Sequence, residues 1–394
     1  MAETHDKGAI DSSSIILNKI RSGDSEFKQI FTDRFHRAGF TGWPKADAIF
    51  KDYFDEKEIT IGLEYKPPYQ EKREYMTGVG QAISYLYHND YAGLIIPKFS
   101  KDNFPISDFV IDLINKRNEI NQLPICIFDY DPKIPISSNN LFLRKKITHK
   151  NDYIFEKKDD KGRVKVFWAW WRDLSNFEIY DILSLCKKYD KRKSEDIYTK
   201  YVWPEFKYKL ESGKALTWEG IPRKRPSIPP GEKQNYKIPL FQLGFINQDT
   251  GHLTQYGFRF LNLCEQVGPD SKIFMQALGN HILTEGKHMQ LIDLIYYFQE
   301  KIMKEKKEFK SSEHKKLFDN YLVEVGQVPP WEERKPGRKT TDGKQHYIRD
   351  EFKLWNKLGF LCNDKKKYFR DNYGLQFDWP KIIETYNFDI HKFI

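Results

Sequence analysis

Apolar residues in the first 130 positions recur at two spacings, one typical of strands and one typical of helices. Short alternating or continuous apolar runs, which indicate strands, occur in "ADAIFKDYF", "ITIGLEYKPP", "YAGLIIPK" and "LPICIFDY". Apolar residues three or four apart, which indicate helices, occur in residues 16–40, in "TGVGQAISYLYHND" and in "DFVIDLINKRN". The order helix, strand, strand, helix, strand, helix, strand predicts an α/β layer arrangement with a mixed sheet.

Local signals predict where the first of these elements begin and end. The first helix is expected to carry an apolar stripe and to have Asp24 or Ser25 as its N-cap; the stripe is Phe27, Ile30, Phe31 and Phe35. The tight connection "DEKE" predicts that the first two strands form a hairpin. A charged segment follows, and Thr77 is expected to open the second helix.

The pattern changes after about residue 143, where charged and aromatic residues become dense. "KKITHKNDYIFEKKDDKGRVKVFWAWW" predicts a charged hairpin that ends in an aromatic cluster, Phe167, Trp168, Trp170 and Trp171. We interpret this cluster as a core seam between domains, with base stacking as the alternative. "IPRKRPSIPPGEK" (221–233) is rich in Pro, Arg and Lys and is interpreted as a linker.

A short internal repeat lies beyond this linker. "LGFINQD" (243–249) and "LGFLCND" (358–364) share one frame, and each follows a short apolar stretch. The first copy precedes a turn, a short strand and a helix for which Thr254 is the expected cap. A helix that ends in Leu-Gly-Phe before a hairpin is typical of winged-helix units, so we expect two such units. Chance is the alternative, because Gly commonly terminates helices.

Length, charge and cysteine content limit the class of protein. A chain of 394 residues is too long for one compact core. The formal net charge is +9, and residues 301–370 hold 19 Lys and Arg against 11 Asp and Glu. This excess permits a polyanionic partner, but ribosomal and histone-like proteins are far more basic. The four cysteines have no CxxC spacing and are expected to be isolated buried thiols, not a zinc site or a disulfide framework.

The distribution of apolar residues predicts where in the cell the protein is located. No run of about 18 apolar residues is present, so we expect no membrane span. The polar start "MAETHDKGAIDSSS" lacks an apolar signal core, which favours a cytoplasmic protein.

Glu64 and Lys66 stand two positions apart in an otherwise apolar strand, so their side chains share one face. Asp47 begins the preceding strand, and pairing of the strands would bring it close to Glu64. Two carboxylates in that place suit Mg²⁺ and would repel each other without a cation. A neighbouring lysine can orient or deprotonate water, or stabilise developing charge. The face therefore predicts a site for phosphodiester hydrolysis; a solvated ion pair on an edge strand is the alternative.

This arrangement resembles the PD-(D/E)xK nuclease superfamily, with Pro44-x-x-Asp47 and Glu64-Tyr65-Lys66 as the motif. The superfamily usually has Pro directly before Asp, whereas this chain has Ala46 there, so the first half of the motif is imperfect. A helix with Gln81 and Tyr85 follows the ExK strand, as in resolvase-like and RecB-like members. The resemblance covers roughly residues 15–130.

The resemblance implies a nuclease core and names its site. The residues expected to be catalytic are Asp47, Glu64, Lys66 and Gln81. Asp47 and Glu64 are expected to bind Mg²⁺, for which Mn²⁺ can substitute, and Glu26 is a further candidate ligand. Tyr85 is expected to contact DNA. For Gln81 and Tyr85 the alternative is the solvated face of an amphipathic helix, and for Glu26 it is an exposed helix glutamate.

A basic segment, "WEERKPGRKTTDGKQHYIRD" (331–350), is the strongest candidate for DNA contact outside the nuclease core. Its cations surround Pro and Gly in an expected loop; they are Arg334, Lys335, Arg338, Lys339 and Lys344. Such a loop can contact phosphates, and an arginine can bind guanine through two hydrogen bonds. A solvated surface loop is the alternative.

These observations predict four regions and one function. The regions are a catalytic domain (1–140), an aromatic-rich connecting or DNA-recognition region with the linker (141–230), a winged-helix-like module (231–300) and a basic winged-helix-like module (301–394). We expect a Mg²⁺-dependent type II restriction endonuclease acting on double-stranded DNA, and a homodimer is an open option. A repair or transposon-end nuclease is the first alternative. A DNA-binding regulator with a degenerate nuclease fold is the second.

Overall fold

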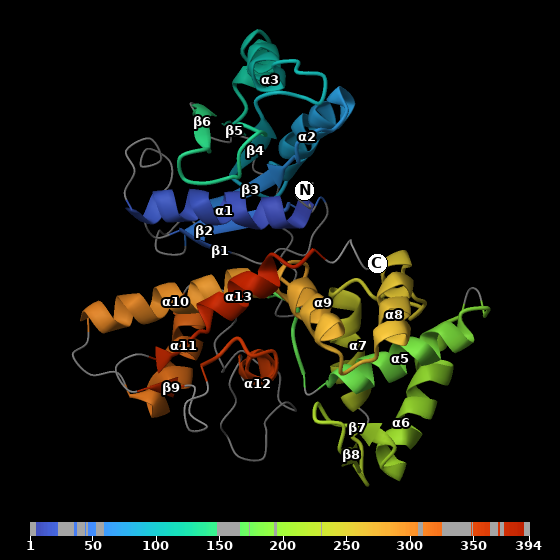
Figure 1. Cartoon of the computed structure of the whole chain (residues 1–394). Coiled ribbons are helices and arrows are strands. Elements are labelled where there is room, and N and C mark those ends of the chain that lie inside the picture. Colours follow the sequence, from blue (N-terminus) through green and yellow to red (C-terminus); the bar gives the residue numbers. More distant parts are fainter. Residues whose placement is uncertain are drawn as a thin grey trace. The chain divides into compact units, whose positions relative to one another are not determined.

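The structure is a computed structural model, and it divides into two compact units (Figure 1). Unit 1 comprises Met1–Phe167 and Asn320–Lys339, and unit 2 comprises Trp168–Asp319 and Thr340–Ile394. The residues that the structure describes are 5–22, 35–37, 44, 46–52, 59–147, 166–172, 174–192, 195–229, 231–305, 310–324, 348, 350–362, 369–370 and 374–389. These two units do not test the functional roles that the sequence analysis gave to four regions, so those roles remain predictions.

A six-stranded mixed sheet forms the centre of unit 1. Its strands lie in chain order: β1 (Phe35–Arg37), β2 (Ala48–Asp52), β3 (Ile59–Tyr65), β4 (Tyr91–Pro97), β5 (Ile125–Tyr130) and β6 (Phe142–Lys145). The central strands β3, β4 and β5 are parallel, whereas β1, β2 and β6 pair antiparallel with their neighbours. The predicted α/β arrangement with a mixed sheet is therefore confirmed, including the hairpin of β2 and β3.

Helices cover both faces of this sheet (Figure 1). Helix α1 (His5–Ser22) packs against β1, β2 and β3, while α2 (Lys72–Tyr85) and α3 (Ile106–Asn115) pack against the other face. A short helix, α4 (Asn118–Asn121), follows α3. Side chains alternate along β3, so Leu63 and Tyr65 belong to the core beneath α1. Glu64 consequently points to the face that α2 covers.

Two predicted elements differ in their boundaries. Phe35, which was expected on the first helix, lies in β1 opposite Asp52, and its ring is buried beneath α1. Helix α2 begins at Lys72 and not at Thr77, because the buried side chains of Tyr75 and Val79 already form a helical stripe against the sheet. The proposed N-cap residues of the first helix lie outside the described residues.

Beyond Phe167 the described chain is mostly helical, as predicted. The helices are α5 (Asn176–Tyr189), η1 (Tyr198–Val202), α6 (Trp203–Ser212), α7 (Glu232–Gln242), α8 (Gln255–Val267), α9 (Lys272–Leu283), α10 (His288–Glu305), α11 (Ser311–Glu324), α12 (Asp350–Lys357) and α13 (Trp379–Tyr386). The short strands are β7 (Ala215–Leu216), β8 (Pro222–Arg223), β9 (Phe369–Arg370) and β10 (Gly374–Leu375). Strands β7 and β8 pair with each other, as do β9 and β10.

The Leu-Gly-Phe repeat corresponds to a repeated local structure. Gly244 after α7 and Gly359 after α12 have φ values of 71° and 75°, a conformation that glycine adopts without steric cost. The next residue closes each helix: Phe245 donates its amide to Leu240, and Phe360 donates to the residue five positions before it, Trp355. The two matching sequence frames therefore reflect two matching helix ends.

The resemblance of the two copies continues past the turn. Ile246 forms an isolated antiparallel bridge with Leu253, and Leu361 forms one with Phe377. In each copy the helix that follows is capped by a side chain, Thr254 for α8 and Asp378 for α13. The predicted cap at Thr254 is thus confirmed, and its side chain accepts a hydrogen bond from the Gly257 amide.

Two segments between these elements lie within unit 2. Residues 221–233 were expected to be a linker, but the Arg225 amide donates to the Leu210 carbonyl at 3.0 Å and its guanidinium pairs with Glu232 at 2.6 Å. Trp168 and Trp171 are buried, so stacking on DNA bases is excluded for these two rings in this structure. The interpretation of the tryptophan cluster as part of a core is therefore confirmed for Trp168 and Trp171.

Two further expectations concern cysteines and membranes. Cys126, Cys186 and Cys264 are buried free thiols as expected, whereas Cys362 is exposed because it lies at the end of the bridge after α12. Across the parts of the chain that the structure describes, no helix combines the length and apolar character that a membrane crossing requires.

Candidate metal centre

Pairing of β2 with β3 brings Asp47 and Glu64 together. Ala48 lies opposite Leu63 in the antiparallel register, which places the preceding residue, Asp47, beside Glu64. The Asp47 amide donates to the Leu63 carbonyl at 3.0 Å, and the Asp47 carboxylate accepts from the Tyr65 amide at 2.8 Å. The backbone amide and the carboxylate of Asp47 are therefore both hydrogen-bonded to β3. The predicted approach of the Asp47 and Glu64 carboxylates is confirmed.

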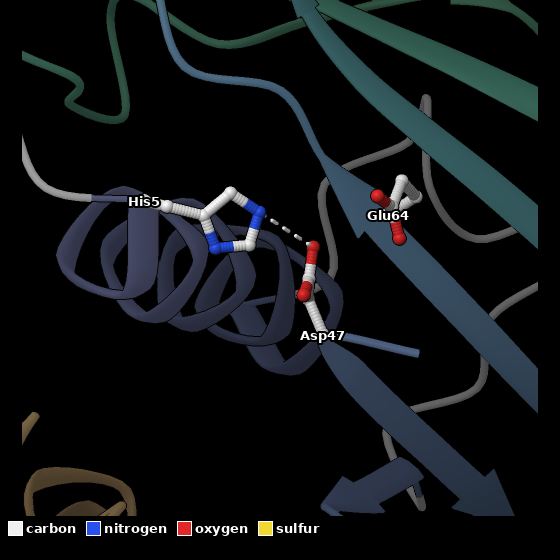
Figure 2. Close-up of side chains that lie close together, drawn as sticks. All are labelled: His5, Asp47 and Glu64. Carbon is white, nitrogen blue, oxygen red and sulfur yellow. Dashed lines mark ion pairs between the residues drawn. The ribbon is translucent and has the colours of Figure 1, made fainter. Parts of the chain in front are cut away.

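A histidine from α1 completes this group. Figure 2 shows His5, Asp47 and Glu64 converging from α1, the start of β2 and the end of β3. Their ligand atoms all lie within 4.8 Å of one another. His5 Nε2 lies 3.4 Å from the Asp47 carboxylate and 3.0 Å from the Tyr65 carbonyl oxygen. Sequence reasoning missed His5, because the motif contains only residues of the hairpin.

The donor set fits a divalent cation. Two carboxylate oxygens and one imidazole nitrogen are ligands that Mn²⁺ and other first-row transition metals accept, while Mg²⁺ prefers oxygen alone. Hydrogen bonding to Asp47, opposed by partial burial, raises the pKa of His5 to about 10. A bound cation would therefore displace a proton from the imidazole, since only neutral histidine coordinates a metal.

Burial and the neighbouring charge of Asp47 both raise the pKa of Glu64. Desolvation, followed by repulsion from Asp47, raises the pKa of Glu64 above its ordinary value, while hydrogen bonds from Tyr85 and Lys66 oppose the shift. A buried carboxylate that faces a second carboxylate in this way favours a cation between them. The electrostatics therefore support the predicted metal-binding role of Asp47 and Glu64.

Lys66 joins Glu64 to α2. Its Nζ lies 2.9 Å from Glu64 Oε1 and donates to Gln81 Oε1 at 2.6 Å. The lysine side chain runs along Gly78, where a Cβ atom would lie 2.8 Å from Lys66 Cε. A glycine in α2 thus leaves the space that the lysine occupies. The interpretation of Glu64 and Lys66 as a solvated surface pair is wrong, because both side chains are buried between β3 and α2.

Tyr85, which was expected to contact DNA, is buried. It is 1% exposed, and its hydroxyl donates to Glu64 Oε2. Burial raises the pKa of Tyr85, so the hydroxyl keeps the proton that it shares with the carboxylate. We therefore assign Tyr85 to the support of Glu64 and not to DNA. The nearby His88 packs edge-on against Tyr87, with ring centroids 4.6 Å apart.

Several predicted site residues lie outside the described residues. Glu26 is one of them, and the cations of the basic segment are the others: Arg334, Lys335, Arg338, Lys339 and Lys344. Their proposed roles in metal and DNA binding therefore remain predictions.

The described centre combines a place for a cation with a fixed ammonium group. Glu64 belongs to the group of three potential ligands with His5 and Asp47, and the Nζ of Lys66 lies 2.9 Å from its Oε1. Such a combination can neutralise a phosphate and stabilise the charge that develops when water attacks it. In comparisons with known sequences, no protein-family model matches this chain, and no curated protein matches it either.

Proposed function

We propose that the protein is a metal-dependent DNA endonuclease. The observation that carries the proposal is the convergence of Asp47, Glu64 and Lys66 at one end of β3, with Gln81 bonded to the lysine. These are the four residues that the resemblance to the PD-(D/E)xK nucleases implies. Their meeting in a buried network is not expected of a chance ExK triplet in a charged sequence.

Each residue has a role that follows from its contacts. His5, Asp47 and Glu64 hold the cation, Mg²⁺ or Mn²⁺, which when bound neutralises phosphate charge and activates water. Tyr85 fixes one oxygen of Glu64, leaving the other to Lys66. Gln81 accepts from Lys66 and so directs the remaining ammonium protons, which stabilise charge on the attacked phosphate.

The rest of the chain supports DNA as the substrate. The basic excess in residues 301–370 favours a polyanion, and the repeated helix ends at Gly244 and Gly359 are compatible with two winged-helix-like modules. A nuclease core joined to a large second part fits a type II restriction enzyme that reads its site with the chain beyond Phe167. Sequence reading requires many base contacts, for which the core alone offers little surface.

The test is digestion of plasmid DNA with Mg²⁺, with Mn²⁺ and with EDTA, followed by mapping of the ends. Lys66→Ala is expected to abolish cutting and to retain DNA binding in a gel shift, because it removes the chemistry and not the docking surface. Discrete ends support a site-specific enzyme. DNA binding without cutting under any metal would favour the regulator with a degenerate nuclease fold.

A further inference from the structure

Tyr69 stands in the segment that joins β3 to α2, three residues after Lys66. Three peptide units span at most about 11 Å between Cα atoms, so the two residues are close whatever the path of the chain. Successive base pairs of DNA lie about 3.4 Å apart. A nucleotide next to the scissile phosphate therefore falls within reach of this segment.

The backbone of Tyr69 is held in an unfavourable conformation. Its φ of 65° is left-handed, which is sterically costly for a residue with a bulky side chain. The buried Tyr75 stabilises the segment: its hydroxyl accepts from the Gln70 amide at 3.1 Å and donates to the Pro67 carbonyl at 3.3 Å. Conformations of this kind persist where the surroundings enforce them, and they gather at binding and catalytic sites.

The Tyr69 side chain is half exposed, and its hydroxyl is hydrogen-bonded. The side chain is 53% exposed, yet its hydroxyl donates to the Pro132 carbonyl at 3.1 Å. Pro132 lies in the segment after β5, which runs parallel to β3 across β4. Both segments therefore leave the same edge of the sheet, where open α/β sheets bind ligands. The bond fixes the hydroxyl end of an aromatic ring that remains half exposed, in the segment that directly follows Lys66.

The residues after Tyr69 border a depression of about 790 Å³. Its rim carries cations of two segments, together with polar and acidic groups: Gln70, Glu71, Lys72, Arg73, Lys101 and Asp102. The Arg73 side chain is 84% exposed and pairs with Glu74 at 3.2 Å, and Lys72 pairs with Asp102 at 2.6 Å. Cations at such a place can hold phosphates that flank the cut, since phosphate contacts fix the register of DNA.

We propose that Tyr69 holds the DNA strand at the cut by stacking its ring on the base of a nucleotide that adjoins the scissile phosphate. An aromatic ring accepts any base, because every base has a flat π face. Neighbouring bases cover these faces in a duplex, so the contact opens the stack at that step. This inference rests on the proposed endonuclease function and adds a residue that touches the substrate.

The first test compares kcat/KM for plasmid cleavage among variants whose thermal unfolding is measured alongside. Tyr69→Leu removes the ring and is expected to lower kcat/KM about 5- to 100-fold, mainly through KM, as the loss of one base stack predicts. Tyr69→Phe keeps the ring without the bond to Pro132 and is expected to retain most of the activity. Tyr87→Ala is the matched control, since Tyr87 is 52% exposed just beyond the other end of α2, and it is expected to cut like wild type.

A double-mutant cycle separates base contact from a structural role. Once the cut is mapped, duplexes are made that lack the base on one or the other side of it. At the contacted nucleotide, removing base and ring together is expected to lower kcat/KM no more than removing either alone. If the two effects multiply at both positions, or if Tyr69→Leu cuts like wild type, the inference is wrong and the nuclease assignment stands. A wild-type protein that leaves DNA intact with both Mg²⁺ and Mn²⁺ overturns both.

Discussion

His5 Nε2 lies 3.4 Å from the Asp47 carboxylate, although His5 begins α1 and Asp47 precedes β2. The contact depends on a close approach of α1 to the sheet. At Gly8, one turn further along the helix, a Cβ atom would lie 2.3 Å from the Tyr65 ring. A larger residue there would lift the start of α1 from β3. The first helix therefore contributes His5 to the candidate metal centre as well as covering the sheet.

The first prediction follows from this contact. His5→Ala should weaken Mn²⁺ binding by at least about tenfold, because weaker support around a metal ligand already costs about 10- to 100-fold in affinity. Mg²⁺ binding should change less, since imidazole is a poor ligand for that ion. Titration calorimetry of both ions measures the difference, with His88→Ala as the control. Unchanged Mn²⁺ affinity in His5→Ala would remove histidine from the ligand set.

A pair of glycines in α2 provides the second prediction. Gly78→Ala places a methyl group 2.8 Å from Lys66 Cε and 3.0 Å from its Cγ, so the flexible lysine must move away from Gln81. Cleavage should fall at least about tenfold while the fold is retained, because alanine favours helix. Gly80→Ala meets nothing within 4 Å and should cut normally, with up to about 1 kcal/mol of added stability. Equal cleavage rates in the two variants would show that the position of Lys66 is unimportant.

The part of the centre that sequence could predict is the part built from one hairpin. The alternation of side chains in β3 and the pairing with β2 place Asp47, Glu64 and Lys66 by local rules alone. His5 could not be predicted, because its position depends on how α1 crosses the sheet, and that is decided by packing between distant residues. Tyr85 was found by its helical spacing, but whether its hydroxyl faces DNA or Glu64 depends on burial.

The fold shows the same division between local and distant causes. Thr254 was predicted as a cap because the signal lies within three residues of the helix that it begins. Phe35 was misplaced because its apolar spacing fits a helix, while pairing with β2 turns it into a strand. The segment 221–233 has the composition of a linker, yet hydrogen bonds and an ion pair hold it within unit 2.

A buried carboxyl in unit 2 leads to a prediction about pH. Burial raises the pKa of Glu351 from 4.5 to about 7, against the charge of Arg172, and the carboxylate accepts from the Trp171 amide at 3.1 Å. Because the folded state binds this proton more tightly, the contribution of Glu351 to stability is complete below pH 4.5 and is lost as the pH rises through 7. The free energy of unfolding should thus fall by about 2 kcal/mol between pH 5.5 and 8.

The measurement is urea unfolding of the protein at several pH values in this range, with tryptophan fluorescence as the signal for unit 2. Glu351→Gln keeps an acceptor for the Trp171 amide and removes the titration, so its stability should vary less with pH than that of wild type. A variant whose stability changes with pH as wild type does would exclude Glu351 as the responsible group.

The basic segment 331–350 is expected to contact DNA phosphates. Replacing Arg334, Lys335, Arg338 and Lys339 together by Ala should weaken DNA binding and reduce the slope of log K against log salt, by up to about 0.9 for each phosphate that the variant no longer neutralises. Fluorescence anisotropy with labelled duplex DNA at several salt concentrations gives the slope. An unchanged slope would mean that the segment is a solvated surface.

The last prediction concerns which part of the chain binds DNA without cutting it. The two winged-helix-like modules were expected at residues 231–394, but unit 2 begins at Trp168. The Ala169 amide donates to the Gly286 carbonyl at 2.8 Å, and the buried His288 bonds to the Ala169 carbonyl at 2.8 Å. A fragment of residues 166–394, which also contains the Asn320–Lys339 part of unit 1, should therefore fold, bind duplex DNA in a gel shift at low salt and leave it intact with Mg²⁺ or Mn²⁺. A fragment from Gly231 lacks α5, which packs against α8, and should lose cooperative thermal unfolding by circular dichroism. If the longer fragment folds but has no affinity for DNA, the DNA contacts must be sought in residues 1–165, beginning with Lys72, Arg73 and Lys101 at the rim of the depression after Tyr69.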